Sequence, residues 1–153
     1  MKIRVEIDET LQEDELIIHC RKVDESIAAI QNFVSSQKKA PTFEFRKGDQ
    51  EYFLDLNDIL FFETGDDIVF GHTREDAYQI KMRLYELEDL LPKNFVRISK
   101  STIANILHIR SLQHRFNSAS LIQFRDTHKE VYVSRMYYKI LKEKMQERRY
   151  YEK

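Results

Sequence analysis

Two short segments near the start of the chain alternate apolar and polar residues. In residues 2–8 the apolar positions are Ile3, Val5 and Ile7. Residues 15–21 follow a similar alternation, and the acidic residues 9–14 separate the two segments. Alternation with a period of two is typical of strands with one buried face. We therefore predict two strands joined by an acidic loop.

The period then changes from two residues to the spacing of a helix. Asp24 is a suitable N-cap, and the apolar residues that follow it three or four positions apart are Ile27, Ile30 and Val34. The polar residues 35–39, with Ala40 and Pro41, form the expected linker. Residues 1–41 are thus predicted to be a small ββα extension, separate from a domain at residues 42–153.

After the linker the chain consists of many short apolar runs separated by turn residues, which predicts a mainly β domain. The expected strands are residues 43–47, 51–54, 59–63, 68–72, 77–81, 95–98, 106–112, 120–124 and 130–133. Leu84, Leu87 and Leu91 indicate a short amphipathic helix that Pro92 ends. A last helix is expected from Ser134 to about Tyr150.

Composition narrows the class of protein. Apolar residues make up 42% of the 153 residues, and there are only three glycines and two prolines, as in a folded domain with a short extension. No run approaches the roughly 18 apolar residues of a membrane helix, and the first residues have a strand pattern and not that of a signal peptide. Cys20 is the one cysteine. We expect a cytoplasmic protein.

The net charge of -1 conceals a strong asymmetry. Residues 1–92 contain 11 Lys and Arg against 21 Asp and Glu, a net charge of -10. Residues 93–153 contain 14 against 5, a net charge of +9. A basic region of this kind favours a polyanionic partner. The alternative is a dipolar protein-interaction module, with no specific DNA site, whose acidic and basic parts face each other.

Three segments carry a recognisable motif. They are DILFFE at residues 58–63, FVRISKSTIAN at residues 95–105, and EVYVSR at residues 130–135, which is followed by a helix rich in tyrosine. In this order, over about residues 42–148, they resemble the LytTR (LytR/AlgR-type) DNA-binding domain family. The resemblance implies a ten-stranded, mainly β fold without a helix-turn-helix, preceded here by the ββα extension.

The resemblance also implies a function. Members of this family are bacterial transcription regulators whose loops enter successive major grooves of double-stranded DNA at direct repeats in promoters. They bind as dimers or as two adjacent copies, so we expect a homodimer. No cofactor is implied.

Two base-reading positions of the family carry cations here. Lys100 follows the Phe-x-Arg-x strand, where its ammonium suits guanine O6 or N7 or a phosphate, and its neighbours Ser99 and Ser101 are small phosphate donors. Arg135 begins the last helix, and its planar guanidinium suits guanine. We expect the Ser134 hydroxyl to cap that helix near a phosphate. The alternative for Arg135 is an ion pair with Asp126 or Glu130.

Other candidates are less direct. The third reading loop holds Asp66 and Asp67, whose carboxylates would repel phosphate, so Asp67 is a candidate only for a base contact such as cytosine N4. Additional candidate phosphate contacts are Lys93, Arg115 and Asn117. Arg97 is expected to form a structural ion pair. The cations of the last helix, which alternate with glutamates, are expected to provide steering charge.

No other chemistry is indicated. The five histidines have no metal-ligand spacing, and there is neither a phosphate-binding glycine loop nor a nucleophile elbow, so we expect no metal site and no enzyme activity. About 41 residues are too few for a phosphorylated receiver domain. The extension is instead expected to form a dimer contact, to dock a membrane-bound inhibitor protein, as in short relatives of the family, or simply to complete the fold.

Overall fold

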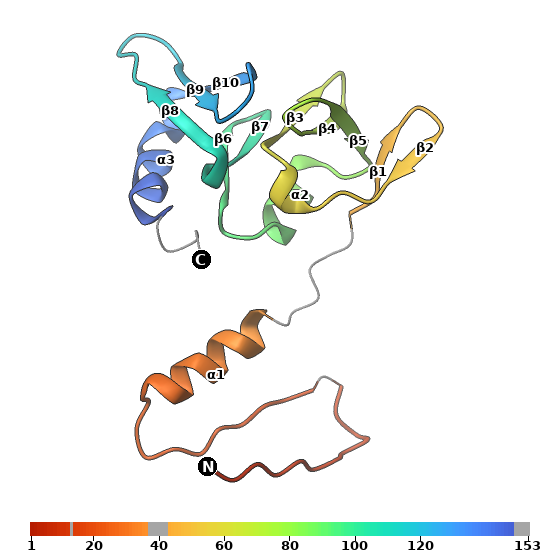
Figure 1. The fold of residues 1–153 in the computed structure, drawn as a ribbon, viewed down its shortest axis with the longest axis vertical. Coiled ribbons are helices and arrows are strands. Elements are labelled where there is room, and N and C mark those ends of the chain that lie inside the picture. The colour runs from red at the N-terminus through yellow and green to blue at the C-terminus, as the bar shows by residue number, and fades with distance from the viewer. Residues whose placement is uncertain (13, 37–42, 149–153) are drawn as a thin grey trace. The chain divides into compact units, whose positions relative to one another are not determined.

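A computed structural model of the chain describes residues 1–12, 14–36 and 43–148 (Figure 1). The chain divides into two compact units, Met1–Ala40 and Pro41–Lys153. Most of the expected linker, and the expected end of the last helix near Tyr150, lie outside the described residues.

The first unit contains one helix, α1 (Glu25–Ser36), which begins where the sequence predicts. Asp24 Oδ1 accepts a hydrogen bond from the Ile27 amide at 3.1 Å, so Asp24 caps the helix. Among the described apolar side chains of this unit only Ile27 is buried. Helix α1 therefore has no core of its own beneath it.

The two strands expected at residues 2–8 and 15–21 do not form, and the prediction of a ββα extension is wrong in this respect. A hairpin that kept their apolar residues on one face would put Lys2 opposite Arg21 and Asp8 opposite Glu15. Like charges directly opposite each other destabilise a strand pair.

Residues 43–148 form the mainly β domain. Its strands are β1 (Phe45–Lys47), β2 (Gln50–Tyr52), β3 (Phe61–Gly65), β4 (Ile68–His72), β5 (Ala77–Ile80), β6 (Phe95–Ser99), β7 (Thr102–Asn105), β8 (Ile109–Gln113), β9 (Ser120–Phe124) and β10 (Glu130–Val133). Its helices are α2 (Leu84–Leu90) and α3 (Arg135–Glu147), with short 3-10 turns η1 (Leu56–Asp58) and η2 (Ile106–His108).

The ten strands make two antiparallel sheets. The larger has the order β2-β1-β5-β4-β3-β7-β6, and the smaller has the order β10-β9-β8. Helix α3 packs on β6 and contributes the buried Leu141 to the core that it shares with the small sheet. This core joins the two sheets into one domain.

Apolar residues fill two cores on opposite faces of the large sheet. Phe61 belongs to the core shared with α3 and the small sheet, whereas its neighbour Phe62 belongs to the core under α2. Ala104 and Ile103 on β7 divide in the same way. Successive side chains of a strand point to opposite faces, so a sheet covered on both faces buries both.

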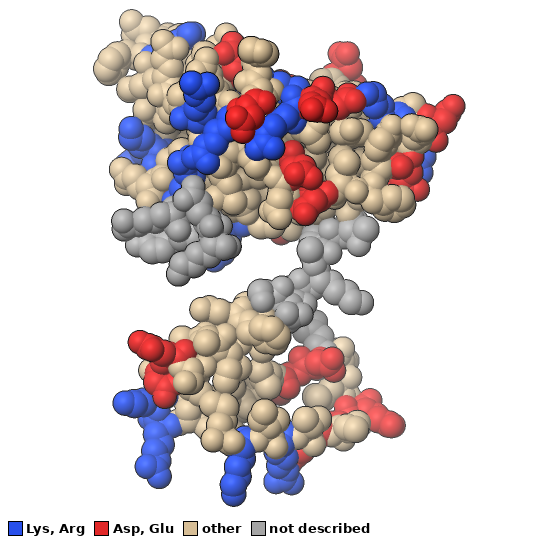
Figure 2. All heavy atoms as spheres, viewed as in Figure 1, with Lys and Arg blue, Asp and Glu red and all other residues tan. Residues whose placement is uncertain are grey.

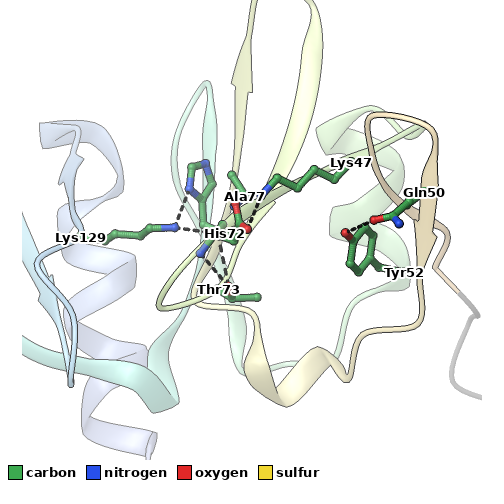
Figure 3. A network of polar contacts seen from close by, with 8 residues as sticks. Lys47, Gln50, Tyr52, His72, Thr73, Ala77 and Lys129 are labelled. Atoms are coloured by element: carbon green, nitrogen blue, oxygen red, sulfur yellow. Dashed lines mark hydrogen bonds and ion pairs between the residues drawn. The ribbon is translucent and has the colours of Figure 1, made fainter.

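A polar cluster joins the two sheets at one side of the domain (Figure 3). Lys129, in the turn before β10, donates to the carbonyl of Asp76 at 2.7 Å and lies 3.5 Å from His72 Nδ1. Burial, and then the nearby Lys129 ammonium, lowers the pKa of His72 to about 4. Glu63 lies 3.8 Å from His72 Nε2, too far to offset burial, so His72 is neutral at pH 7.

Candidate nucleic-acid interface

Backbone hydrogen bonds bring the turns that hold the candidate residues together along one edge of the domain. Strand β3 pairs with β7 so that Glu63 faces Thr102, and the Thr64 amide donates to the Ser101 carbonyl at 2.9 Å. The β3–β4 turn, which contains Asp66 and Asp67, therefore lies beside the β6–β7 turn, which contains Lys100 and Ser101. These turns are 35 residues apart in sequence but adjacent in space.

The start of α3 joins the same edge from the other side. The Ser134 amide donates to the Ile98 carbonyl at 2.9 Å, which holds the β10–α3 junction against the end of β6. Val133 pairs with Ser120, the first residue of β9, so the β8–β9 loop (residues 114–119) ends there as well. We call this side, formed by the β3–β4 turn, the β6–β7 turn, the β10–α3 junction and the β8–β9 loop, the loop edge.

Arg97 holds the turn that presents Lys100. Its Nε donates to the Ser99 carbonyl at 2.6 Å, and its Nη2 donates to the Lys100 carbonyl. Its Nη1 lies 3.0 Å from Glu88 Oε2, which is the structural ion pair that the sequence predicts. Lys100 itself is exposed, and its ammonium has no hydrogen bond or ion pair among the described residues. The turn is thus fixed while its cation stays available.

The two serines on either side of Lys100 are tied to each other. The Ser101 amide donates to Ser99 Oγ at 3.2 Å, and the two hydroxyls lie 3.3 Å apart. Each hydroxyl retains hydrogen-bonding capacity, because a serine oxygen can donate one bond and accept two. They shape the turn and remain at its surface.

Arg135 is exposed on the first turn of α3. Within the described parts of the chain it forms no ion pair, so the alternative pairing with Asp126 or Glu130 is not observed; Asp126 lies instead 4.0 Å from Arg74. A guanidinium without an internal partner keeps its five donors for another molecule.

Ser134 does not cap α3 with its hydroxyl, contrary to our prediction. Its Oγ is buried and has no hydrogen-bond partner among the described residues. Its carbonyl accepts from the amides of Tyr137 and Tyr138 at 3.0 and 3.1 Å. The backbone of Ser134 is extended, with φ -68° and ψ 151°, as at an ordinary N-cap, so the orientation of the side chain is what keeps the hydroxyl from the helix amides.

The β3–β4 turn has a backbone that few residues adopt. Asp66 and Asp67 have φ angles of 50° and 63°, the left-handed conformation at both central positions of a type I′ turn. Aspartate tolerates this conformation better than most residues. Both carboxylates are exposed at the tip, so this end of the loop edge is acidic.

The remaining candidates fall into two places. Arg115 and Asn117 lie in the β8–β9 loop, where the Arg115 amide donates to Ser120 Oγ at 3.2 Å. Lys93 precedes β6, whereas Lys100 follows it. A five-residue strand spans about 13 Å, so Lys93 lies at the other end of β6 from the loop edge. The structure therefore does not bring Lys93 together with Lys100 and Arg135.

Pattern reasoning missed two aromatic features of the β8–β9 loop. Phe116 is 84% exposed at its tip, although large apolar side chains are usually covered. His114 stacks on Tyr138 of α3 with ring centroids 4.2 Å apart, which anchors the loop against the helix. The only sequence signal for either was the position of an aromatic residue among turn residues.

Charge is unevenly spread over the domain. In the face shown in Figure 2, Lys and Arg gather on the side of α3, while Asp and Glu are more frequent toward β1 and β2. No group of His, Cys, Asp and Glu among the described residues could hold a metal ion. None of the described helices is long and apolar enough to cross a membrane.

A two-sheet β domain with exposed, unpaired cations on adjacent segments fits a DNA-binding domain that has no helix-turn-helix among its described helices. Residues 49–146 match the LytTr DNA-binding domain family. The chain belongs to this family.

Similar proteins agree with the assignment. A protein of Staphylococcus aureus strain NCTC 8325 is 31% identical over 145 residues, which cover 95% of this chain and 98% of that protein. A protein of the bovine strain RF122 is 32% identical over the same length, and both are named uncharacterized HTH-type transcriptional regulators. The solved LytTr DNA-binding domain of a Bacillus cereus response regulator has the same fold, with a TM-score of 0.62 and 24% identity over 67% of this chain and 95% of that one.

The relatives' name mentions a helix-turn-helix, but the described helices of this chain do not form one. Helices α1, α2 and α3 are separated in sequence by strands, and no two of them are joined by a short turn. The ten-stranded fold is the one that the family resemblance implies.

Proposed function

We propose that this protein is a transcription regulator that binds promoter DNA sequence-specifically, at direct repeats, through the loop edge. The observation that carries the proposal is the position of Lys100 and Arg135 on the loop edge, one in the β6–β7 turn and one at the start of α3, each exposed and without a hydrogen bond or ion pair among the described residues. The relatives at 31–32% identity are named as transcriptional regulators, which supports the same role here. Such a regulator acts in the cytoplasm, where bacterial DNA lies.

The proposed contacts divide into base reading and phosphate binding. Arg135 can donate two parallel hydrogen bonds to guanine O6 and N7, and Lys100 can reach the same acceptors in the major groove. Ser99 and Ser101, with the free amides at the start of α3, are suited to phosphate, whereas the buried Ser134 hydroxyl is left outside the proposed contacts. Arg115 and Asn117 extend the phosphate contacts along the β8–β9 loop. Phosphate contacts supply affinity, and the two cations supply sequence preference.

Asp67 has a different proposed role. Its carboxylate repels phosphate, so the β3–β4 turn is proposed either to stay clear of the DNA backbone or to accept a hydrogen bond from cytosine N4. Lys93, at the far end of β6, is left outside the proposed interface.

The alternative function, a protein-interaction module with internally neutralised charge, requires the basic residues to face acidic ones. Arg97 does pair with Glu88 in this way. Lys100 and Arg135, the two cations on which DNA reading depends, pair with no carboxylate among the described residues. Their exposure favours an external polyanion.

The test begins with selection of binding sites from a random duplex library by the full chain. On the selected duplex, Arg135→Ala and Lys100→Ala should each lose about 1–3 kcal/mol of binding free energy and relax the preference at one base position. Lys93→Ala removes the same charge as Lys100→Ala and serves as the matched control, with little expected effect. Affinity should fall steeply with salt.

Two outcomes would contradict the proposal. One is enrichment of no sequence over random duplex at any salt concentration. The other is an equal loss of affinity for all sequences in the Arg135→Ala and Lys93→Ala variants, because that would make both cations general phosphate contacts.

A further inference from the structure

Residues 2–8 belong to no helix or strand, and nothing in the described structure covers their apolar side chains. Ile3, Val5 and Ile7 are 89%, 81% and 90% exposed. The segment has no strand partner among the described residues, and its one ion pair joins Arg4 to the nearby Glu6 at 2.9 Å. Three β-branched residues in strict alternation have a strong preference for a sheet. This segment therefore has the pattern of a strand without the strand's partner.

The sequence of the segment is complementary to itself when one copy is reversed. If two copies run antiparallel with Val5 opposite Val5, then Ile3 lies opposite Ile7 and all three apolar pairs share one face. On the other face Lys2 lies opposite Asp8, and Arg4 lies opposite Glu6. Every charged residue thus meets the opposite charge, and each pair occurs twice by symmetry.

We propose that residues 2–8 of two copies of this chain pair as antiparallel strands about a two-fold axis at Val5. A contact in which the same patch of each subunit meets itself is the usual geometry of a two-fold dimer. The apolar face of the pair gives attraction, and the charges give the register.

Other registers are worse by the same criteria. A shift of two residues keeps the apolar residues on one face but places Arg4 opposite Arg4, or Glu6 opposite Glu6. A shift of one residue moves the apolar side chains of one copy to the charged face. A parallel pair in register sets every charge against its own kind. Only the register about Val5 satisfies all four charged residues.

The segment at residues 15–21 is a poorer partner than a second copy. The hairpin that aligns the apolar residues places Lys2 opposite Arg21 and Asp8 opposite Glu15, which are both like-charge pairs. The single chain accordingly shows no hairpin. Charge thus disfavours pairing within the chain and favours pairing between two chains.

The similarity to other proteins extends into the first unit of the chain. The match to the Staphylococcus aureus relative covers 95% of this chain and 98% of the relative, so it extends well into residues 1–41. The pairing needs neither the loop edge nor DNA, so it is tested without DNA and stands or falls separately from the proposed function.

The first experiment is a charge reversal in the full chain, followed by analytical ultracentrifugation over a range of protein concentrations. Arg4→Glu turns two attractive pairs into repulsive ones and should weaken self-association by about tenfold or more. The double variant Arg4→Glu/Glu6→Arg restores opposite charges and should dimerise like the original chain. Lys22→Glu changes charge outside the paired segment and serves as the control.

The second experiment fixes the register through disulfide formation in a Cys20→Ser background. Directly opposed positions of an antiparallel pair have Cβ atoms about 4.5–5.5 Å apart, close to disulfide distance. The Val5→Cys variant should therefore form a covalent dimer. The Ile3→Cys variant should not, because its two copies lie roughly 13 Å apart along the strands. A mixture of Ile3→Cys and Ile7→Cys chains should form the cross-linked heterodimer.

The proposal is overturned if the chain is monomeric at all concentrations, or if it dimerises without sensitivity to Arg4→Glu. It is also overturned if Ile3→Cys and Val5→Cys cross-link equally well. A monomeric chain would leave residues 2–8 for a different partner, such as an inhibitor protein.

Discussion

Gly71 offers the sharpest test of how the core of the large sheet is packed. It lies in β4, where it pairs with Phe62 of β3 on one side and Tyr78 of β5 on the other. A Cβ atom added to Gly71 would lie 2.8 Å from Phe45 Cε1 and 3.1 Å from Phe62 Cε1. The backbone cannot withdraw, because neighbouring strands hold it on both sides. Gly71→Ala must therefore displace the two rings.

The size of the effect follows from how little room those rings have. Carbon atoms in contact prefer about 3.5–4.0 Å, so the Phe45 ring must move by about 0.7 Å or more. Phe45 and Phe62 are both fully buried and stack on each other with centroids 6.3 Å apart. Overpacking of this kind costs about 1–3 kcal/mol. For a domain of about 100 residues, each kcal/mol lowers the Tm by about 4–8 °C.

The assay is chemical and thermal denaturation of Gly71→Ala beside Gly65→Ala. An added Cβ at Gly65 meets nothing within 4 Å, and Gly65 has no positive φ. Gly65→Ala therefore replaces a glycine by alanine, as Gly71→Ala does, but creates no steric clash. Gly65→Ala should be neutral or slightly stabilising. Phe45→Leu in the Gly71→Ala background should recover part of the loss, a non-additive effect. Equal stability of the two alanine variants would refute the packing described for this core.

Three further predictions concern single side chains. Arg97→Lys removes the guanidinium bonds that hold the β6–β7 turn, so it should weaken binding to a selected duplex without changing the protein's base preference. Glu88→Gln should weaken binding less than Arg97→Lys does. A changed base preference would make Arg97 a reading residue. The pKa of His72 is lowered to about 4 in the folded protein, so between pH 6.5 and 4 the unfolded chain binds a proton at this histidine more readily than the folded chain does. The contribution of His72 to stability is therefore fully present above pH 6.5 and is lost as the pH falls toward 4. Urea denaturation at pH 7 and pH 5 should differ by up to about 2 kcal/mol on this account, and His72→Gln should flatten that difference. Ser134→Ala should leave the free energy of unfolding within about 0.5 kcal/mol, where loss of a capping hydroxyl would cost about 1 kcal/mol; a larger loss in a thermal melt would show that the hydroxyl has a bonded partner.

Alternation and spacing predicted most elements of residues 43–148 but not strand β7. All four of its residues are buried, because the large sheet is covered on both faces, so no polar and apolar alternation marks it. The start of β8 was also predicted too early. Asn105 Oδ1 accepts from the Leu107 amide at 3.1 Å and turns residues 106–108 into η2 before the strand begins. Such capping depends on a side chain whose orientation the pattern does not contain.

The opposite error occurred at the start of the chain, where alternation predicted strands that do not form. Alternation describes the preference of a segment, but a strand also needs a partner with compatible charges. Residues 2–8 and 15–21 have matching apolar positions, but the two ends of the strand pair would carry like charges. Lys2 would lie opposite Arg21, and Asp8 opposite Glu15. Pairwise charge could have been examined in the sequence, and it would have corrected the prediction.

The candidate site was predicted residue by residue but not as an assembly. Motif positions identified Lys100 and Arg135, and strand position identified Arg97 as part of an ion pair. The bond between the Ser134 amide and the Ile98 carbonyl, which holds the β10–α3 junction against the end of β6, joins segments 36 residues apart. A main-chain bond of this kind carries no residue signature. The same holds for Lys129 and His72, which meet only because the two sheets pack together.

The bonds that assemble the loop edge have one further consequence, for how such a protein can diverge. Thr64 to Ser101 and Ser134 to Ile98 are both amide-to-carbonyl contacts, so the framework that holds the loops does not use the side chains at the tips. Residues such as Lys100 and Arg135 can be exchanged at little cost in folding free energy, since exposed positions without internal bonds tolerate substitution. Descendants of one ancestral domain can therefore change the surface of one loop at a time while inheriting the scaffold intact.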